Sequence, residues 1–173
     1  ARVTLVSGPT NLAAPAAVEL VRVSTAREMH DAVMSRAPQN HIVIKAAAVA
    51  DFEALAVADR KIKKDPLSDE LTLTLRKTPD ILADLALLQP RPFLVAFAAE
   101  TDSVEGNARE KLSRKGADLI VANDVSDRAI GFDSDENEVV VFDRDGVVER
   151  IERSAKATVA QRILAIVAAR IAS

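Results

Sequence analysis

The segment HIVIKAAAV, residues 41–49, is apolar at every position except His41 and Lys45. A short apolar run rich in β-branched residues is typical of a parallel strand that is covered on both faces. Two further segments, Phe93–Ala99 and Asp118–Ala122, have the same character. Helix-like patterns alternate with these strands at Thr25–Arg36, Thr78–Leu88 and Val104–Lys115. This alternation predicts an α/β fold, a Rossmann-like doubly wound parallel sheet.

Strand-like segments toward both ends of the chain extend the predicted sheet: Arg2–Ser7, Val18–Val23, Val139–Phe142 and Val147–Ile151. The last two flank Asp145-Gly146, and an Asp-Gly pair between apolar runs is a strong hairpin signal. Ser154 is the predicted cap of a final helix with an apolar stripe on one side. We therefore expect an antiparallel hairpin at one edge of the parallel sheet.

The composition narrows the classes of protein. The chain has 173 residues, of which 49% are hydrophobic, and this is enough for one folded domain with a real core. With 23 basic and 26 acidic residues it is mildly acidic, which argues against a nucleic-acid partner. The sequence contains no cysteine and no apolar run of membrane-spanning length. These features predict a soluble, cytoplasmic protein with no membrane partner.

Asp51 is the first candidate for chemistry. Open α/β sheets bind ligands outside the carboxyl ends of their strands, and Asp51 follows the strand at residues 41–49. The small side chains of Ala46–Ala48 would let a ligand approach the backbone. A carboxylate there can accept a hydrogen bond from a ribose hydroxyl or hold Mg²⁺. An aspartate that only caps the strand end is the alternative, and position alone does not decide between them.

Several lysines are candidates for contacts to phosphate. In KIKK, residues 61–64, an extended backbone would place Lys61 and Lys63 on one face, where two ammonium groups suit a polyphosphate. A solvated basic edge strand explains the same pattern. Lys111 and Lys115 are four residues apart and share a helical face, which is also a common solvated arrangement.

The segment Lys77-Thr78-Pro79-Asp80 predicts a helix start, where free backbone N–H groups can bind an anion. Ordinary helix capping explains this segment as well. Phe97 lies in a predicted strand and belongs to the core unless a base stacks on it. The sequence contains neither GxxxxGK[ST] nor GxGxxG, and this disfavours a P-loop kinase and an NAD-dependent reductase.

Seven stretches, taken in order along the chain, resemble one enzyme family: VTLVSGP (residues 3–9), AAAVADF (46–52), KIKK (61–64), KTPDIL (77–82), VAFAAET (95–101), KLSRKGADLIVANDVS (111–126) and GFDSDENEV (131–139). The family is phosphopantothenoylcysteine synthetase, usually the C-terminal half of the bacterial bifunctional coenzyme A biosynthesis protein. The resemblance implies a ligase that condenses 4′-phosphopantothenate with L-cysteine. It implies CTP as the co-substrate, an acyl-cytidylate intermediate, and CMP and pyrophosphate as products.

The resemblance also implies a set of nucleotide-contacting residues: Lys45, Ala46, Ala47, Asp51, Lys61, Pro79, Asp80, Ile81, Leu82, Phe97, Lys111 and Lys115. Lys61 corresponds to the family's flap lysine, which is associated with catalysis, and Asp51 is the candidate ligand for Mg²⁺. The segment 55–77 resembles the family's protruding arm, which pairs with a second subunit, so a homodimer is expected. FMN is expected only if a decarboxylase domain precedes this one.

The sequence departs from the family at its N-terminal side. The family begins with a strand, a TREPLDPVR-like stretch and an ISN-S-SG motif, and this chain picks up at the family's second strand. We therefore expect residues 1–173 to lack a first βα unit of the ligase domain, to bind CTP poorly and to turn over little. The alternative function is a noncatalytic nucleotide-binding or dimerisation fragment.

Overall fold

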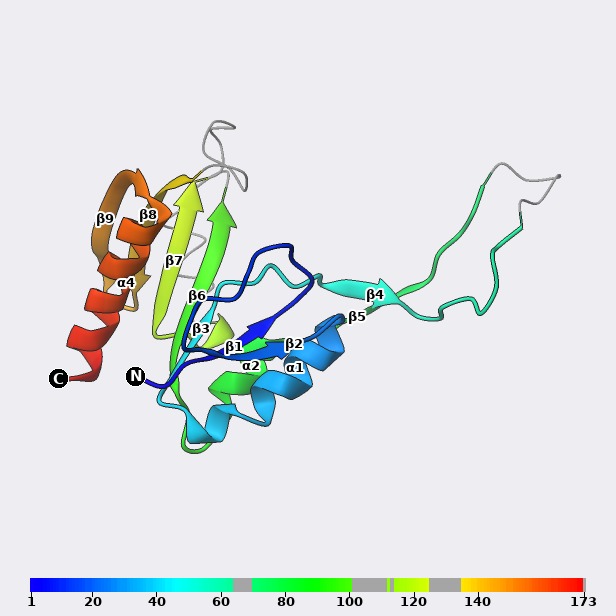
Figure 1. Cartoon of the computed structure of the whole chain (residues 1–173), viewed down its shortest axis with the longest axis horizontal. Helices are drawn as coiled ribbons and strands as arrows, with labels where there is room; N and C mark the ends of the chain where they lie inside the picture. The colour runs from blue at the N-terminus through cyan, green and yellow to red at the C-terminus, as the bar shows by residue number, and fades with distance from the viewer. Residues whose placement is uncertain (64–69, 101–111, 113, 125–134, 173) are drawn as a thin grey trace. The chain divides into compact units, whose positions relative to one another are not determined.

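The computed structural model describes the chain except residues 64–69, 101–111, 113, 125–134 and 173 (Figure 1). It contains two compact units. The first unit comprises residues 1–33 and 48–80, and the second comprises residues 34–47 and 81–173. Among the described residues, no helix is long and apolar enough to cross a membrane.

The first unit contains a short parallel sheet and a helix. Strands β1 (Thr4–Ser7) and β2 (Glu19–Arg22) pair in parallel, and helix α1 (Ala26–Met34) follows. Thr25 followed by Glu28 three residues later is the sequence pattern of a capping box, and the structure confirms it at the start of this helix. The Glu28 N–H donates to Thr25 Oγ1 at 3.1 Å, and the Thr25 N–H donates to Glu28 Oε2 at 3.3 Å. This exchange satisfies backbone donors that the first helical turn leaves without partners.

The first unit also contains the base of an arm. Strands β4 (Phe52–Ala54) and β5 (Leu75–Lys77) form an antiparallel pair, and residues 55–63 and 70–74 extend outward from it (Figure 1). In the sequence, Leu71, Leu73 and Leu75 alternate with polar residues, a pattern typical of a strand with one buried and one wet face, and the structure contradicts this expectation. Leu71, Leu73 and Leu75 are all more than half exposed. The alternation provides apolar side chains, but no layer of the described chain covers them.

The second unit is built on a five-stranded mixed sheet in the order β3-β6-β7-β8-β9. Its strands are β3 (Ile42–Lys45), β6 (Phe93–Glu100), β7 (Leu119–Asp124), β8 (Glu136–Asp143) and β9 (Gly146–Ala155). The first three are parallel and the last two form the antiparallel hairpin. The predicted α/β class is therefore confirmed, with a parallel region and an antiparallel edge.

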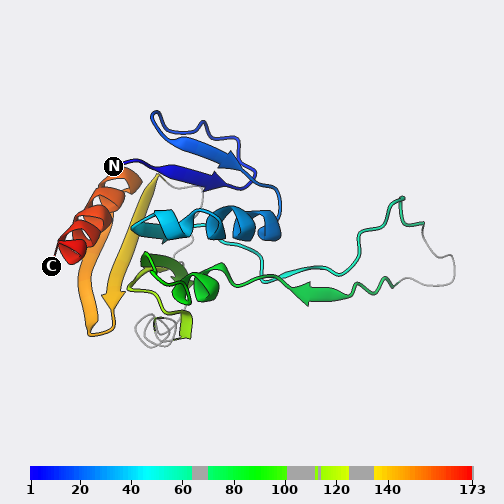
Figure 2. The same ribbon diagram turned by 90° about the horizontal axis from the view of Figure 1, so that it is seen from below.

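One face of this sheet carries the core. Helix α4 (Lys156–Ile171) packs along β8 and β9 (Figure 2), and its buried residues are Val159, Ile163 and Val167. They belong to one cluster with side chains from the strands: Val95, Leu119, Val121, Val139, Val141 and Ile151. Each of these strand residues is shielded from water, and burying such a side chain contributes about 1.5–3 kcal/mol. The predicted apolar stripe of the last helix is thus correct.

Smaller elements connect the strands. A 3₁₀ turn, η1 (Ala37–Gln39), precedes β3, and helix α2 (Ile81–Ala86) packs against β6. Before β7, the described residues Leu112, Arg114 and Lys115 are helical, as expected. The greater part of the predicted helix at residues 104–115 lies outside the described residues.

Three local predictions were wrong. The strand expected at residues 41–49 ends at Lys45 and lies at an edge of its sheet, with Ile42 and Ile44 exposed rather than buried on both faces. Ser154 does not cap the last helix, because its hydroxyl donates to the Glu152 carbonyl at 2.8 Å. Thr78 is not a cap either, because its hydroxyl donates to the Ala50 carbonyl at 2.6 Å.

Candidate functional site

The carboxyl ends of β3 and β6 bring four of the predicted site residues together. Parallel pairing matches Lys45 with Ala96. Ala46 and Ala47 follow Lys45 in the chain, and Phe97 follows Ala96. The Phe97 ring is 37% exposed, and both alanines are exposed. An aromatic surface beside small residues is an arrangement on which a nucleobase can stack with its sugar close to the backbone.

Lys45 contributes positive charge at this edge. Its Nζ donates to the Ala47 carbonyl at 3.0 Å, which folds the side chain back over the end of its own strand. The ammonium group therefore lies beside the two exposed alanines. A phosphate that approached them would meet a cation that the strand end already positions.

An amide side chain lies near the carboxyl end of the third parallel strand. In β7, Asn123 is matched with Ala99 of β6 on one side and with Val139 of β8 on the other. Its Oδ1 atom is buried and has no hydrogen-bond partner. The sequence analysis did not select Asn123, because the sequence does not show that this side chain is buried.

In the first unit, the root of the arm brings Asp51 close to the segment that leads into α2. The Thr78 N–H donates to the Asp51 carbonyl at 3.0 Å, while the Thr78 hydroxyl binds the preceding carbonyl. Pro79 and exposed Asp80 follow directly. Two stretches far apart in the sequence, both predicted to contact nucleotide, are therefore held side by side.

A charged cluster fixes the same root. Glu53 and Arg76 are directly paired across β4 and β5, and the Arg76 Nε donates to Glu53 Oε1 at 2.7 Å. Arg27 of α1 reaches the same oxygen at 3.4 Å. The hydrogen bond from Arg76, assisted by Arg27, holds the pKa of Glu53 below its ordinary value. No pattern in the sequence indicated this cluster, because it depends on strand register.

The remaining predicted residues are less concentrated. Lys61 and Lys63 lie exposed on the arm, and Lys64 and Lys111 lie outside the described residues. Ile81 and Leu82 are buried in α2, so a ligand could contact only their backbone. Lys115 is half-buried at the end of its helical segment.

A metal site made by the protein alone is not formed in the described part of the chain. No group of three or more His, Cys, Asp or Glu side chains there is arranged to hold an ion. The Asp51 side chain is exposed, and a single carboxylate fits Mg²⁺ that takes its other ligands from water and substrate phosphates. Asp51 as a Mg²⁺ ligand stays a prediction.

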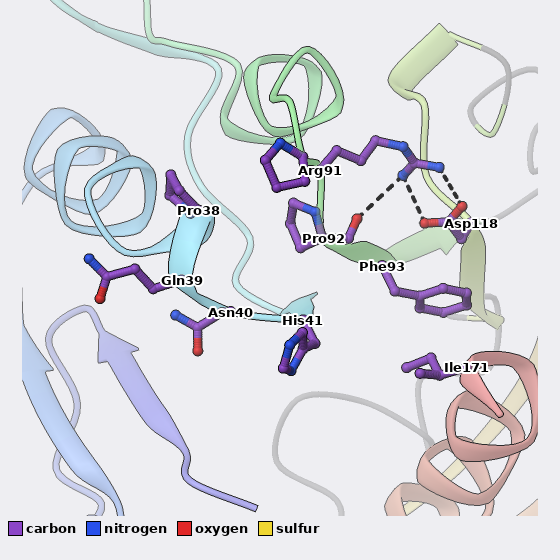
Figure 3. Close-up of a pocket in the computed structure, with 10 residues that line it drawn as sticks. Pro38, Gln39, Asn40, His41, Arg91, Pro92, Phe93, Asp118 and Ile171 are labelled. Atoms are coloured by element: carbon purple, nitrogen blue, oxygen red, sulfur yellow. Dashed lines mark hydrogen bonds and ion pairs between the residues drawn. The ribbon is translucent and has the colours of Figure 1, made fainter.

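A pocket of about 570 Å³ lies at the amino ends of β3, β6 and β7 (Figure 3). None of the predicted site residues lines it. Two guanidinium nitrogens of Arg91 donate to the two carboxylate oxygens of Asp118 at 2.6 and 2.8 Å. Asp118 also accepts the Leu94 N–H at 2.7 Å. The hydrogen bonds to Asp118 raise the pKa of Arg91 above its ordinary value. The charges at this end are paired with each other.

Comparison with known proteins gives a consistent result. The model of the DNA/pantothenate metabolism flavoprotein C-terminal domain family matches residues 1–171. The Escherichia coli K12 coenzyme A biosynthesis bifunctional protein CoaBC is 51% identical over 148 residues. That match covers 84% of this chain and 36% of the relative, so the chain spans little more than a third of the relative's length.

Two solved structures have a similar fold. The C-terminal domain of a coenzyme A biosynthesis bifunctional protein CoaBC is 35% identical with a TM-score of 0.80, covering 98% of this chain and 74% of that one. A Cab2 mutant in complex with phosphopantothenate-cysteine is 20% identical with a TM-score of 0.61, covering 79% of this chain and 46% of the other. At that identity the second likeness concerns the fold alone.

Proposed function

The chain belongs to the DNA/pantothenate metabolism flavoprotein C-terminal domain family, and from this we propose that it performs the ligase step of coenzyme A biosynthesis. In this step 4′-phosphopantothenate and L-cysteine are joined at the expense of CTP. The observation that carries the proposal is the match over residues 1–171, together with 51% identity to a bifunctional coenzyme A biosynthesis protein. The product in the Cab2 complex is the compound this reaction would form.

The proposed reaction has two covalent steps. The carboxylate oxygen of phosphopantothenate attacks the α-phosphorus of CTP, and the bond to the β-phosphate breaks, giving acyl-cytidylate and pyrophosphate. The amine of cysteine then attacks the acyl carbon, loses a proton and expels CMP. The first step brings an anion toward a polyanion, so it depends on positive charge around the phosphates.

The carboxyl edge of the second unit would bind the nucleotide. Phe97 offers an exposed ring, and Ala46 and Ala47 leave their backbone accessible. Lys45 supplies a cation within reach of the same strand end. Lys111 and Lys115 complete this group in the proposal, through their positive charge.

The root of the arm carries the candidate ligand for Mg²⁺. The Thr78 N–H donates to the Asp51 carbonyl, and Pro79 and Asp80 follow Thr78 in the chain. Mg²⁺ bound at Asp51 would supply charge neutralisation on phosphates. Lys61 is exposed on the arm, and in the proposal its ammonium neutralises the pyrophosphate as it forms. FMN would belong to a decarboxylase domain elsewhere in the full protein, not to these residues.

A homodimer is part of the proposal. Apolar side chains that are more than half exposed gather on the arm: Leu55, Val57, Ile62, Leu71, Leu73 and Leu75. Exposed apolar surface of this kind is typical of a protein interface. Sedimentation analysis of a Leu71→Glu/Leu73→Glu double variant should give a monomer, with Leu164→Glu, another exposed leucine, remaining dimeric.

The test of the function is pyrophosphate release that requires both CTP and phosphopantothenate. Lys61→Ala should lower kcat by about 10²–10³-fold, the loss typical for one group that stabilises developing charge. Lys63→Ala is the matched control and should retain most of the activity. Full activity of Lys61→Ala, or release that does not depend on CTP, would refute the assignment.

The second candidate is a noncatalytic nucleotide-binding or dimerisation module, favoured by the exposed apolar side chains of the arm. Calorimetric titration with CTP separates the two functions. Binding of CTP without pyrophosphate release would support the module. Release that requires both CTP and phosphopantothenate would support the ligase.

A further inference from the structure

Thr78 makes two hydrogen bonds to one short stretch at the root of the arm. Its N–H donates to the Asp51 carbonyl at 3.0 Å, and its hydroxyl donates to the Ala50 carbonyl at 2.6 Å. The second distance is at the short end of the range for a hydroxyl donor. Ala50 and Thr78 are 28 residues apart in the sequence, so folding alone brings these groups together.

The two carbonyls that Thr78 binds belong to the peptide groups on either side of the Asp51 Cα. A peptide group is planar, so a hydrogen bond that holds its carbonyl holds the whole group. With both neighbouring groups held, the backbone torsions of Asp51 are restricted, and these torsions set the direction of its Cα–Cβ bond. Thr78 therefore limits, through the backbone, the directions in which the Asp51 carboxylate can point.

The position of Thr78 at the end of a strand pair explains why a side chain is needed. Strands β4 and β5 are paired from Phe52 opposite Lys77 outward, and the N–H of Thr78 adds one more backbone bond beyond that pair. The next residue, Pro79, has no N–H to donate. The Thr78 hydroxyl supplies a donor at the point where the backbone lacks one.

We infer that Thr78 is a positioning residue, whose two hydrogen bonds direct the Asp51 carboxylate toward the Mg²⁺-bound nucleotide. This inference rests on the proposed function, in which Asp51 is the ligand for Mg²⁺, and adds to it a residue that acts through Asp51. Groups that hold a ligating side chain in place affect metal affinity, because a ligand that is free to move loses its preferred geometry.

The alternative is that Thr78 only stabilises the root of the arm. Ala50 is exposed, so water can replace the hydroxyl at its carbonyl when that hydroxyl is removed. The loss of stability should therefore be small. A purely structural contact predicts this small loss and an unchanged affinity for nucleotide. Only the positioning role predicts a weaker affinity that depends on Asp51.

The experiment begins with Thr78→Val, which removes the hydroxyl but keeps the branched shape and the backbone N–H. Calorimetry with CTP in the presence of Mg²⁺ gives Kd, and urea unfolding gives stability. We expect Thr78→Val to raise Kd about 3- to 10-fold, and Thr78→Ser, which retains the hydroxyl, to restore most of the affinity.

Thr4→Val is the matched control. Thr4 is another half-buried threonine of the first unit, and its hydroxyl donates to Glu19 Oε2 at 3.2 Å. The same chemical change there should leave Kd unchanged. If Thr78→Val fails to fold, Thr78→Ala is compared with Thr4→Ala in the same way.

A double-mutant cycle with Asp51→Asn tests whether Thr78 acts through Asp51. Two residues that act as one unit give losses that do not add, so Thr78→Val should have little further effect on Kd in the Asp51→Asn background. Losses that add fully, or an unchanged Kd in Thr78→Val alone, would overturn the inference while leaving the proposed function intact. If the unsubstituted protein does not bind CTP, the proposed function fails and this inference with it.

Discussion

The two ends of the parallel strands in the second unit differ in how their polar groups are satisfied. At the amino ends, Asp118 binds both Arg91 and the Leu94 N–H, and the charges are paired within the fold. At the carboxyl ends, Phe97 is partly exposed and Asn123 Oδ1 is buried without a partner. A region that satisfies its own groups serves stability, whereas one that leaves groups unsatisfied is available to a ligand.

The largest expected effect that tests this difference is on stability at the amino end. Asp118→Ala removes the carboxylate that pairs with Arg91 and leaves the N–H of fully buried Leu94 without its acceptor. We expect the free energy of unfolding to fall by about 2–4 kcal/mol, since hydrogen bonds to charged groups are the costly ones to lose. Urea unfolding measures the loss, and the Kd for CTP should not change.

Asp118→Asn is the control for that prediction. The amide keeps an oxygen for the Leu94 N–H but loses the charge opposite Arg91, so its effect should be clearly smaller. An Asp118→Ala variant that binds CTP more weakly while remaining folded would contradict the division between the two ends.

At the carboxyl end the expected effect is on binding. Phe97→Ala should weaken CTP binding about 10-fold, within the range found when an aromatic platform for a base is removed. The loss of stability should be modest, because the ring is 37% exposed already. Calorimetry and urea unfolding distinguish these effects, and Phe93→Ala, at the amino end of the same strand, is the matched control. Equal CTP affinity for both variants would remove the reason to place the base at this edge.

The smallest effect concerns pH and the root of the arm. Arg76 and Arg27 lower the pKa of Glu53, so this group stabilises the fold above its unfolded pKa of 4.5, and the contribution disappears as the pH falls through the lower folded value. Glu53→Gln should therefore be less stable than the unsubstituted protein at neutral pH. The difference should vanish in strong acid.

Chemical unfolding at pH 7 and below pH 4 measures this difference. Glu152→Gln, a change at an exposed glutamate, is the control and should behave alike at both pH values. A Glu53→Gln deficit that persists unchanged below the folded pKa would show that the carboxylate charge is not its source.

Much of the fold could be predicted from local sequence. The capping box at Thr25 and Glu28, the strands of the second unit and the stripe of the last helix follow from periodicity and local hydrogen bonding. Predictions failed where a distant partner decided the outcome. Thr78 binds the carbonyl of Ala50 rather than the start of a helix.

The candidate site likewise contains residues that the sequence analysis selected and residues that only the structure identified. Asp51 and the lysines were selected from residue type and order, and the resemblance to a family gave them roles. The Glu53 cluster, the Asp118 network and Asn123 were not selected. Each depends on strand register or on burial, which no single position in the sequence records.

The sequence by itself determined the α/β class, the family resemblance and the residue types available for phosphate and nucleotide chemistry, because composition, periodicity and motif order are local properties of the chain. The tertiary structure alone decided that the strand ending at Lys45 lies at a sheet edge and that Thr78 is tied to the backbone of Asp51. It also decided that the oxygen of Asn123 is buried without a partner. Pairing and burial arise from contacts between residues far apart in the sequence, and only the folded chain brings these residues together.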